Sequence, residues 1–290
     1  MDRTDAEGRR RPVTTLTSKE HAEEARPRMS PRRKRRIARG VQYAVFFVAV
    51  ALVGVLADWN GLQEQFLEPS VAERLFPDLI TVALLNTVVY TLSGFAAGLV
   101  LGLAVALMRL SSVAPYRWVA MAYIEFFRGL PALLIFIFVG VGVPLAFPGT
   151  AFPGGTYGQV ACALGLVSAA YMAETIRAGI QAVPRGQLEA ARTLGMPHAT
   201  AMRSIVIPQA FRIIVPPLTN ELVLLFKDSS LVLFLGVTLQ QRELTKFGRD
   251  FAGQTANTTP IFVAGLCYLL VTVPLGYLVR RLEARHAKER

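Results

Sequence analysis

Six long runs of mainly apolar residues divide this chain of 290 residues. A run of about 17–25 apolar residues is long enough to cross the hydrocarbon core of a bilayer. Within that core the backbone must satisfy its own hydrogen bonds, which a helix does. We therefore predict an all-α polytopic membrane protein of about six transmembrane helices, at Val41–Ala57, Ile80–Met108, Val119–Phe147, Gln159–Ile180, Phe211–Val237 and Pro260–Val279.

The composition also indicates a membrane protein, and the position of the excess positive charge along the chain narrows the choice of binding partners. With 53% hydrophobic and 18% charged residues, the chain is too apolar for an ordinary soluble domain. Its net charge of +11 would suit nucleic acid, but residues 1–40 alone hold 13 Lys or Arg against 6 Asp or Glu. We predict that residues 1–40 form a disordered basic cytoplasmic tail that contacts membrane lipids rather than nucleic acid.

The first span, Val41–Ala57, is short, and its last three residues, Val55-Leu56-Ala57, imitate a signal-peptidase site. A polar leader of 40 residues is long for a signal peptide, so we predict an uncleaved transmembrane helix.

Basic residues flank the spans on one side, which predicts the orientation. They lie before the first span, between the second and third, between the fourth and fifth, and after the sixth, where residues 281–290 form a second basic tail. The positive-inside rule makes this side cytoplasmic, with both termini inside. The third outside loop, with Arg242, Lys246 and Arg249, goes against the trend.

The polar segment between the fourth and fifth spans has a fixed pattern, Glu189-Ala190-Ala191-x3-Gly195-x9-Ile205-x-Ile207-Pro208. It resembles the EAA loop of permease subunits in bacterial ABC importers, E-A-A-x3-G-x9-I-x-L-P, with Ile207 as the one departure. The resemblance implies a short helix that docks in a groove of a cytoplasmic ATPase subunit. Small alanines allow close approach, and a glycine can end a helix in the left-handed conformation. An ordinary helix–turn–helix connector is the alternative. The candidate ATPase-coupling residues are Gly186, Glu189, Ala190, Ala191, Gly195 and Pro208.

Ionisable side chains inside the predicted spans mark a candidate substrate path, because charges in a membrane are costly and usually functional or paired. Glu125 with Arg128, and Glu174 with Arg177, have i, i+3 spacing, so mutual neutralisation is an alternative to function there. Lys227 lies deeper in its span, which favours a functional role. The candidate path residues are Asn86, Glu125, Arg128, Glu174, Asn220, Lys227, Asp228 and Ser229.

Small residues and prolines predict how the helices pack and break. Gly94, Gly98 and Gly102 repeat at every fourth residue, which favours close helix crossing in lipid. Pro131 and the pair at positions 216 and 217 are expected to kink or unwind their helices, freeing backbone groups to line a cavity.

Four segments extend the resemblance to the polar amino-acid branch of ABC permeases: Tyr123–Pro131, Ala173–Gly179, Gly186–Ala191 and Lys227–Leu231. That branch often has Thr where Ser229 stands. The likeness covers residues 78–280, with the coupling loop at 186–208. It implies a five-helix permease core to which residues 41–57 add a span.

The resemblance also implies function, location and partners. The chain would be the permease subunit of an ATP-driven, binding-protein-dependent importer in the bacterial cytoplasmic membrane, carrying a polar amino acid, with glutamate or glutamine favoured. Its implied partners are a cytoplasmic ATP-binding subunit, a second permease subunit and an extracytoplasmic substrate-binding protein.

The chain lacks the motifs of an enzyme. It has no G-x-x-x-x-G-K-[ST] loop and no Gly-Lys dipeptide, so ATP would bind a partner and we predict no cofactor. Cys162 and Cys267 lie in apolar runs and the three histidines are scattered, so we predict no metal site.

Three rival functions stay open on the sequence. The nearest is an ABC permease for another small solute, such as a metal or a sulfonate. An ion-coupled secondary transporter would need inverted repeats, which the sequence does not display. A membrane-anchored protein that binds nucleic acid or lipid through residues 1–40 is the third.

Overall fold

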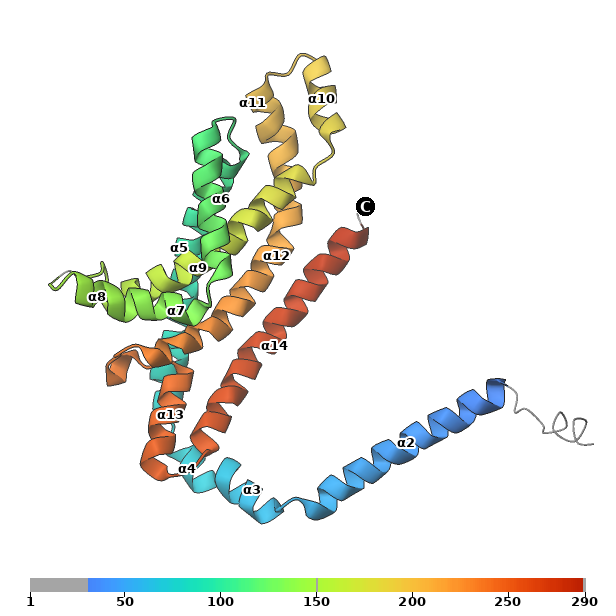
Figure 1. Ribbon diagram of the computed structural model, residues 1–290, viewed down its shortest axis with the longest axis vertical. Helices are drawn as coiled ribbons and strands as arrows, with labels where there is room; N and C mark the ends of the chain where they lie inside the picture. Colours follow the sequence, from blue (N-terminus) through green and yellow to red (C-terminus); the bar gives the residue numbers. More distant parts are fainter. Residues whose placement is uncertain (1–30, 150, 289–290) are drawn as a thin grey trace, which may run out of the picture. The chain divides into compact units, whose positions relative to one another are not determined.

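The computed structural model describes residues 31–149 and 151–288, and within these ranges every regular element is helical (Figure 1). The predicted disordered tail falls mainly on residues 1–30, outside the described residues. Residues 31–40, expected in that tail, instead begin α2 (Pro31–Leu56). Residues 281–288, expected as a second tail, continue the last helix, and residues 289–290 lie outside the described part.

The chain divides into two units, residues 1–59 and residues 60–290. In the first, α2 leaves all its described side chains exposed, and its segment Lys34–Leu56 is long and apolar enough to cross a membrane. Helix α3 (Trp59–Phe66) has only its first residue in the first unit and continues into the second unit. The further elements of the second unit are α4 (Pro69–Glu73), η1 (Leu79–Leu84), α5 (Leu85–Leu110), α6 (Ala114–Gly129), α7 (Ala132–Ile137), η2 (Phe138–Gly142), α8 (Val143–Ala146), α9 (Thr156–Gln181), α10 (Arg185–Thr193), α11 (His198–Ala201), η3 (Met202–Val206), α12 (Ile207–Asp228), η4 (Ser229–Phe234), η5 (Leu239–Gln241), α13 (Leu244–Thr255) and α14 (Thr259–Lys288).

Five of the six predicted spans pass the test of length and apolar composition for crossing a membrane, one of them as a bent pair of helices. Among the described residues, four helical segments are long and apolar enough to cross a membrane, and a bent pair makes a fifth if it counts as one span. The expected span Phe211–Val237 is not among them. Its helix, α12, carries four charged residues and ends at Asp228, after which the chain tightens into the 3₁₀ helix η4.

The predicted third span, Val119–Phe147, is broken rather than straight. Residues Ala114–Gly129 and Ala132–Ala146 meet at an angle of 104°. The break falls at Leu130 and Pro131, whose extended backbone separates α6 from α7. Proline cannot donate the helical hydrogen bond and disfavours a helical residue before it, so this break was predictable. By contrast, α12 continues without a break through Pro216 and Pro217.

Among the described helices, α5 and α9 have the most extensive contact, because glycines on α5 let the two backbones approach closely. A Cβ added at Gly94 would lie 2.5 Å from Leu164 Cβ, and one at Gly102 would lie 3.0 Å from the carbonyl oxygen of Ala169. The predicted row of small residues on α5 therefore faces α9 along its length. Such close approach allows dispersion contacts and packing to hold helices together where lipid offers no hydrophobic driving force.

The bundle of the second unit has two distinct ends (Figure 1). Helices α10 and α11 lie at one end, and α4 and α13 lie at the other, with α12 and α14 running between them. A buried cluster at the second end joins α13 and α14 to the start of the α5 span, through Leu75, Leu79, Leu244, Phe247 and Ala264. These two ends carry the functional features described next.

Candidate coupling and translocation sites

The α10 turn is a Schellman motif centred on Gly195. The N–H of Met196 donates to the carbonyl of Ala191 (3.1 Å), and the N–H of Gly195 donates to that of Arg192 (3.0 Å). Gly195 has φ +84°, the left-handed conformation predicted for it. The turn satisfies the carbonyls at the end of α10 and directs the chain into α11 (Figure 1).

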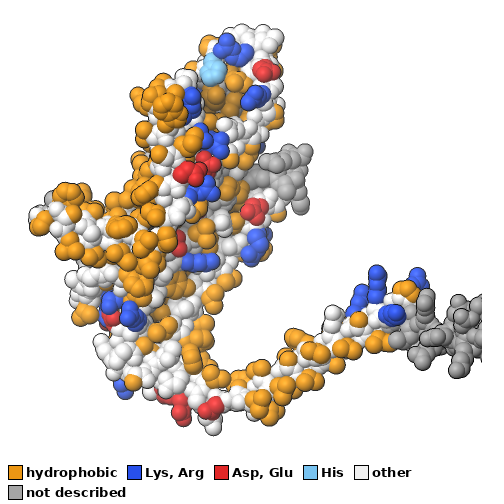
Figure 2. All heavy atoms as spheres, viewed as in Figure 1, with side chains coloured by type: hydrophobic (Ala, Val, Ile, Leu, Met, Phe, Trp, Pro, Cys, Tyr) orange, Lys and Arg blue, Asp and Glu red, His pale blue; other side chains and the backbone are white. Residues whose placement is uncertain are grey.

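The helix before this turn presents an open face. Glu189 and Ala190 are exposed, and Leu194 is 85% exposed, which is unusual for a large apolar side chain. Ala191 instead is buried against its own chain, so only the first of the two alanines is available for close approach by a partner. Gly186 and Pro208 are exposed as well. Figure 2 shows basic and histidine side chains gathered at this end of the unit.

The two predicted i, i+3 pairs behave differently. Arg177 makes two hydrogen bonds to the carboxylate of Glu174, at 3.1 and 3.2 Å, so this pair forms. Glu125 and Arg128 are both exposed, and the ion pairs among the described residues do not include them. Arg128 lies instead over the ring of Tyr171, 5.4 Å from its centroid. Mutual neutralisation, the alternative to a functional role, is therefore present for Glu174 and Arg177 but not for Glu125 and Arg128.

The end of α12 brings together most of the deeper candidates. Lys227 is exposed in the single chain, Asp228 is half-buried, and Ser229 is fully buried with its hydroxyl donating to the carbonyl of Phe226 (2.7 Å). Asn220 is exposed two turns earlier. Within the described residues Lys227 makes no hydrogen bond or ion pair inside its own chain. Its ammonium group is therefore available to a solute, to water or to another subunit.

The side chain of Asn86, which is far in sequence from the charged end of α12, is hydrogen-bonded to other parts of its own chain. Its Nδ2 donates to the carbonyls of Gln240 (2.7 Å) and Arg242 (3.0 Å). Its Oδ1 accepts from the hydroxyl of Tyr157 (2.7 Å). The side chain thus links α5 to α9 and to the η5 turn, with 5% of its surface exposed.

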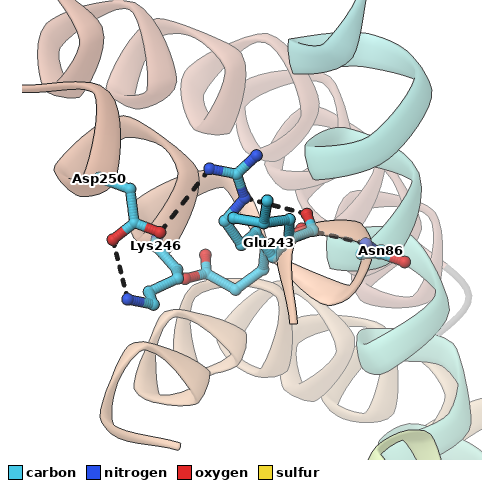
Figure 3. Close-up of polar contacts among 6 residues, drawn as sticks. Asn86, Glu243, Lys246 and Asp250 are labelled. Atoms are coloured by element: carbon cyan, nitrogen blue, oxygen red, sulfur yellow. Dashed lines mark hydrogen bonds and ion pairs between the residues drawn. The ribbon is translucent and has the colours of Figure 1, made fainter. Parts of the chain in front are cut away.

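Sequence reasoning missed the buried acid Glu243, which lies next to this turn (Figure 3). Its side chain is fully buried and caps α13, accepting from the backbone N–H groups of Thr245 and Lys246 at 2.6 Å each. The hydroxyl of Tyr268 in α14 donates to the same carboxylate (2.9 Å). Burial raises the pKa of Glu243 and the hydrogen bonds from Thr245, Lys246 and Tyr268 partly offset that rise, so that the pKa is about 7.

Two of the three basic residues that broke the predicted charge trend, Arg242 and Lys246, are paired at this end (Figure 3), and Arg249 is exposed. Lys246 Nζ donates to Asp250 Oδ1 (2.8 Å), and Arg242 lies 3.7 Å from the other carboxylate oxygen. Arg242 also lies over the rings of Phe247 and Phe251. The Lys246–Asp250 spacing of four residues was a signal of a helix that the loop prediction overlooked.

Among the described residues no group of three or more His, Cys, Asp or Glu is placed to hold a metal ion. Cys162 and Cys267 are free and partly buried.

Comparison with known proteins identifies the family. Residues 98–288 match the family described as binding-protein-dependent transport system inner membrane component. The chain belongs to this family. It is 40% identical over 205 residues to the probable glutamine ABC transporter permease protein GlnM of Bacillus subtilis (strain 168), covering 70% of this chain and 91% of that protein.

Two further relatives support the assignment of this permease. The glutamate/aspartate import permease protein GltK of Escherichia coli O6:H1 is 35% identical over 208 residues, covering 70% of this chain and 92% of that protein. A chain in the crystal structure of an amino acid ABC transporter with histidines is 36% identical in sequence, with a TM-score of 0.65. The match covers 74% of this chain and 96% of that chain.

The family fixes the class of the protein. This permease is a multi-pass, non-catalytic membrane component of a bacterial binding-protein-dependent ABC importer. ATP is bound by the ATPase partner of such an importer, and the family works with a separate substrate-binding protein. The fold predicted from the sequence, an all-helical ABC permease, is confirmed.

Proposed function

We propose that this permease imports a polar amino acid, with glutamine or glutamate as the leading substrates. The observation that carries the proposal is its identity of 40% with a relative named for glutamine and 35% with one named for glutamate and aspartate, each over most of that relative. The amino-acid-branch segments around Arg128, Arg177 and Lys227 lie in the same chain and support the same class of substrate.

The α10 turn transmits the ATPase motion in this proposal. The exposed Glu189, Ala190 and Leu194 form the contact surface for the ATPase subunit, and the Schellman turn at Gly195 fixes its angle to α11. When ATP closes two ATPase subunits, α10 would carry that movement through α11 and η3 into α12. The permease domain comprises residues 78–280, with coupling at 186–208 and α2 as an added span.

The membrane orientation we propose puts α10 and both termini in the cytoplasm. Exposed arginines gather at the α10 end, as the positive-inside rule requires (Figure 2). On the opposite side Arg242 and Lys246 share the one carboxylate of Asp250, which offsets one of their two charges, and Arg249 remains the exposed exception to the rule. With α2 and α12 both crossing, six passes bring the C-terminus back to the starting side.

Lys227 supports both a substrate path on α12 and a second permease subunit. An exposed, unpaired ammonium group facing lipid would be costly. A second subunit of the same or similar kind, packed against this face, would enclose Lys227 and Asn220 in a water-filled route where the charge is tolerated. The other predicted path residues on α6 and α9 stay candidates for that route.

Uptake with competition tests the substrate class. The permease, its ATPase and its binding protein are reconstituted in vesicles, and uptake of labelled glutamine is measured with excess unlabelled glutamate, arginine or an alkyl sulfonate. Glutamate should compete and the sulfonate should not. Uptake of the sulfonate, with no uptake of any amino acid, would contradict the proposal and favour the rival ABC permease for another solute.

A further inference from the structure

The short turn over residues 239–243 is held by side chains from α5 at the end of the bundle opposite α10. Asn86 binds the carbonyls of Gln240 and Arg242, and the hydroxyl of Tyr90 donates to the carbonyl of Gln241 (2.8 Å). Three consecutive backbone carbonyls are therefore bound by neutral side-chain donors. None of these bonds is needed to form a helix, since the turn has its own capping box at Thr238 and Gln241.

These bonds use both N–H groups of the Asn86 side-chain amide. An amide nitrogen has two hydrogens, and both are used on carbonyls of the turn while Tyr157 occupies the amide oxygen. Asn86 has no donor left for a solute unless these bonds open. Its role as a substrate contact, predicted from sequence, is thus conditional on movement of the turn.

The next residues form a different kind of attachment. Glu243 is fully buried and caps α13 with two short bonds from backbone N–H groups, and Tyr268 binds it from α14. The N–H of Leu244 donates to the hydroxyl of Thr87 on α5 (3.1 Å). Breaking this attachment would leave a buried acid and two helix-terminal N–H groups without partners, which is far less favourable than losing a neutral hydrogen bond.

We propose that residues 239–242 form an outer latch, closed by Asn86 and Tyr90 and hinged on the buried Glu243, which opens when substrate enters from the outside. The neutral bonds to the carbonyls of Gln240, Gln241 and Arg242 are the part that opens. Glu243 is a positioning residue, because it keeps α13 and α14 together while the latch moves. Leu235, four residues before the latch, packs over Gly140 of η2.

Opening of the latch must be linked to the ATPase subunits. If the outside opens when the ATPases close, a weaker latch favours closed ATPases, because the coupling between two sites is reciprocal. Variants with a weakened latch should therefore hydrolyse ATP without binding protein faster than the wild-type complex. A residue with a purely structural role would lower assembly but would not raise hydrolysis.

The test compares single hydroxyl deletions in the assembled complex in nanodiscs. Tyr90→Phe removes the latch bond to Gln241, and Tyr157→Phe removes the bond that holds the Asn86 side chain against the latch. Ser93→Ala removes a hydroxyl on α5 that donates only to the carbonyl of Tyr90. ATP hydrolysis is measured without binding protein and normalised to complex recovered by size exclusion. We expect Tyr90→Phe to raise it by up to about fivefold, the effect of one neutral hydrogen bond on a two-state equilibrium, and Ser93→Ala to leave it unchanged.

A second variant strengthens the comparison. Asn86→Asp keeps the shape but replaces the donating amide nitrogen by a carboxylate oxygen, an acceptor that faces two carbonyl oxygens, so it should raise hydrolysis more than Tyr90→Phe does. If Asn86→Asp does not assemble, the tyrosine variants still decide. Hydrolysis in both tyrosine variants equal to that of Ser93→Ala, or lower, would overturn the latch.

The inference rests on the proposed coupling and orientation but not on the amino acid carried. Because the readout needs no substrate, it can succeed even if uptake shows that the solute is not an amino acid. Conversely, glutamine uptake with unaltered hydrolysis in the latch variants would reject the latch and leave the proposed function standing.

Discussion

A single backbone angle at Gly195 determines how α10 ends. A Cβ at this residue would meet no atom within 4 Å, so space is not what requires glycine. Its φ of +84° does, because residues with a Cβ are strained in that region, by roughly 1–2 kcal/mol, and β-branched residues most of all.

Gly195→Val should therefore disturb the coupling turn while the spans still insert. We expect weakened assembly with the ATPase or loss of substrate-stimulated ATP hydrolysis. Gly195→Asn is the matched control, since Asn tolerates the left-handed conformation, and it should keep most of the activity. Equal, wild-type-like hydrolysis in both variants would show that the turn does not couple the subunits.

Glu243 predicts a dependence of stability on pH. Its pKa is raised from the ordinary 4.5 to about 7 by burial, so its stabilising contribution is complete below about pH 4.5 and is lost as pH rises through 7. The charged and titratable groups around it are Arg242, Lys246, Asp250 and the hydroxyls of Tyr90 and Tyr268.

Thermal unfolding of the complex at pH 5, 6, 7 and 8 measures this effect. The free energy of unfolding should fall by about 1–3 kcal/mol over that range, and Glu243→Gln should flatten the fall while lowering stability at every pH because an amide caps α13 less well. Glu64→Gln, at an exposed carboxylate of α3, is the control and should keep the wild-type slope. An unchanged slope in Glu243→Gln would exclude Glu243 as the titrating group.

At the scale of elements, the contact between α5 and α9 depends on the absence of side chains. Gly102 lies against the backbone of Ala169, which cannot move aside, whereas Gly265 in α14 has open space where a Cβ would be. Gly102→Val should lower the stability of the complex by about 1–3 kcal/mol through overpacking, and Gly265→Val should change it little. The melting temperatures of the purified complexes compare the two, and similar values would mean that this helix contact is not needed.

The elements that could be predicted are those set by local pattern. The apolar runs Ile80–Met108, Gln159–Ile180 and Pro260–Val279 predicted the spans that the structure has at residues 79–110, 156–181 and 259–284. Pro131 predicted the break in the expected span Val119–Phe147. The end of α12 at Asp228 and the helix α13 could not be found in that way. Glu243 caps α13 locally, but the Tyr268 hydroxyl that also binds it comes from another helix. A charge-rich outer segment resembles a loop when only its hydropathy is considered.

At the scale of the whole molecule, one candidate site is formed by a single local segment and the other by residues far apart in the sequence. The coupling turn is encoded in one segment of about twenty residues, so its motif and the positive φ of Gly195 followed from sequence. The outer latch joins Asn86 to residues 154 and 156 positions away, and nothing local to Asn86 indicates those partners. Its amide was recognisable only as a polar group in a span.

The central claim is that ATP hydrolysis on a separate subunit drives solute transport by this chain, and that α10 transmits the motion of that subunit. Vesicles containing the complex, with ATP inside and loaded binding protein outside, provide the most direct measurement. We predict that labelled glutamine accumulates only when both are present, and that a proton or sodium gradient without ATP gives no uptake. Uptake driven by such a gradient in the absence of ATP and of the ATPase subunit would contradict the account and favour a secondary transporter.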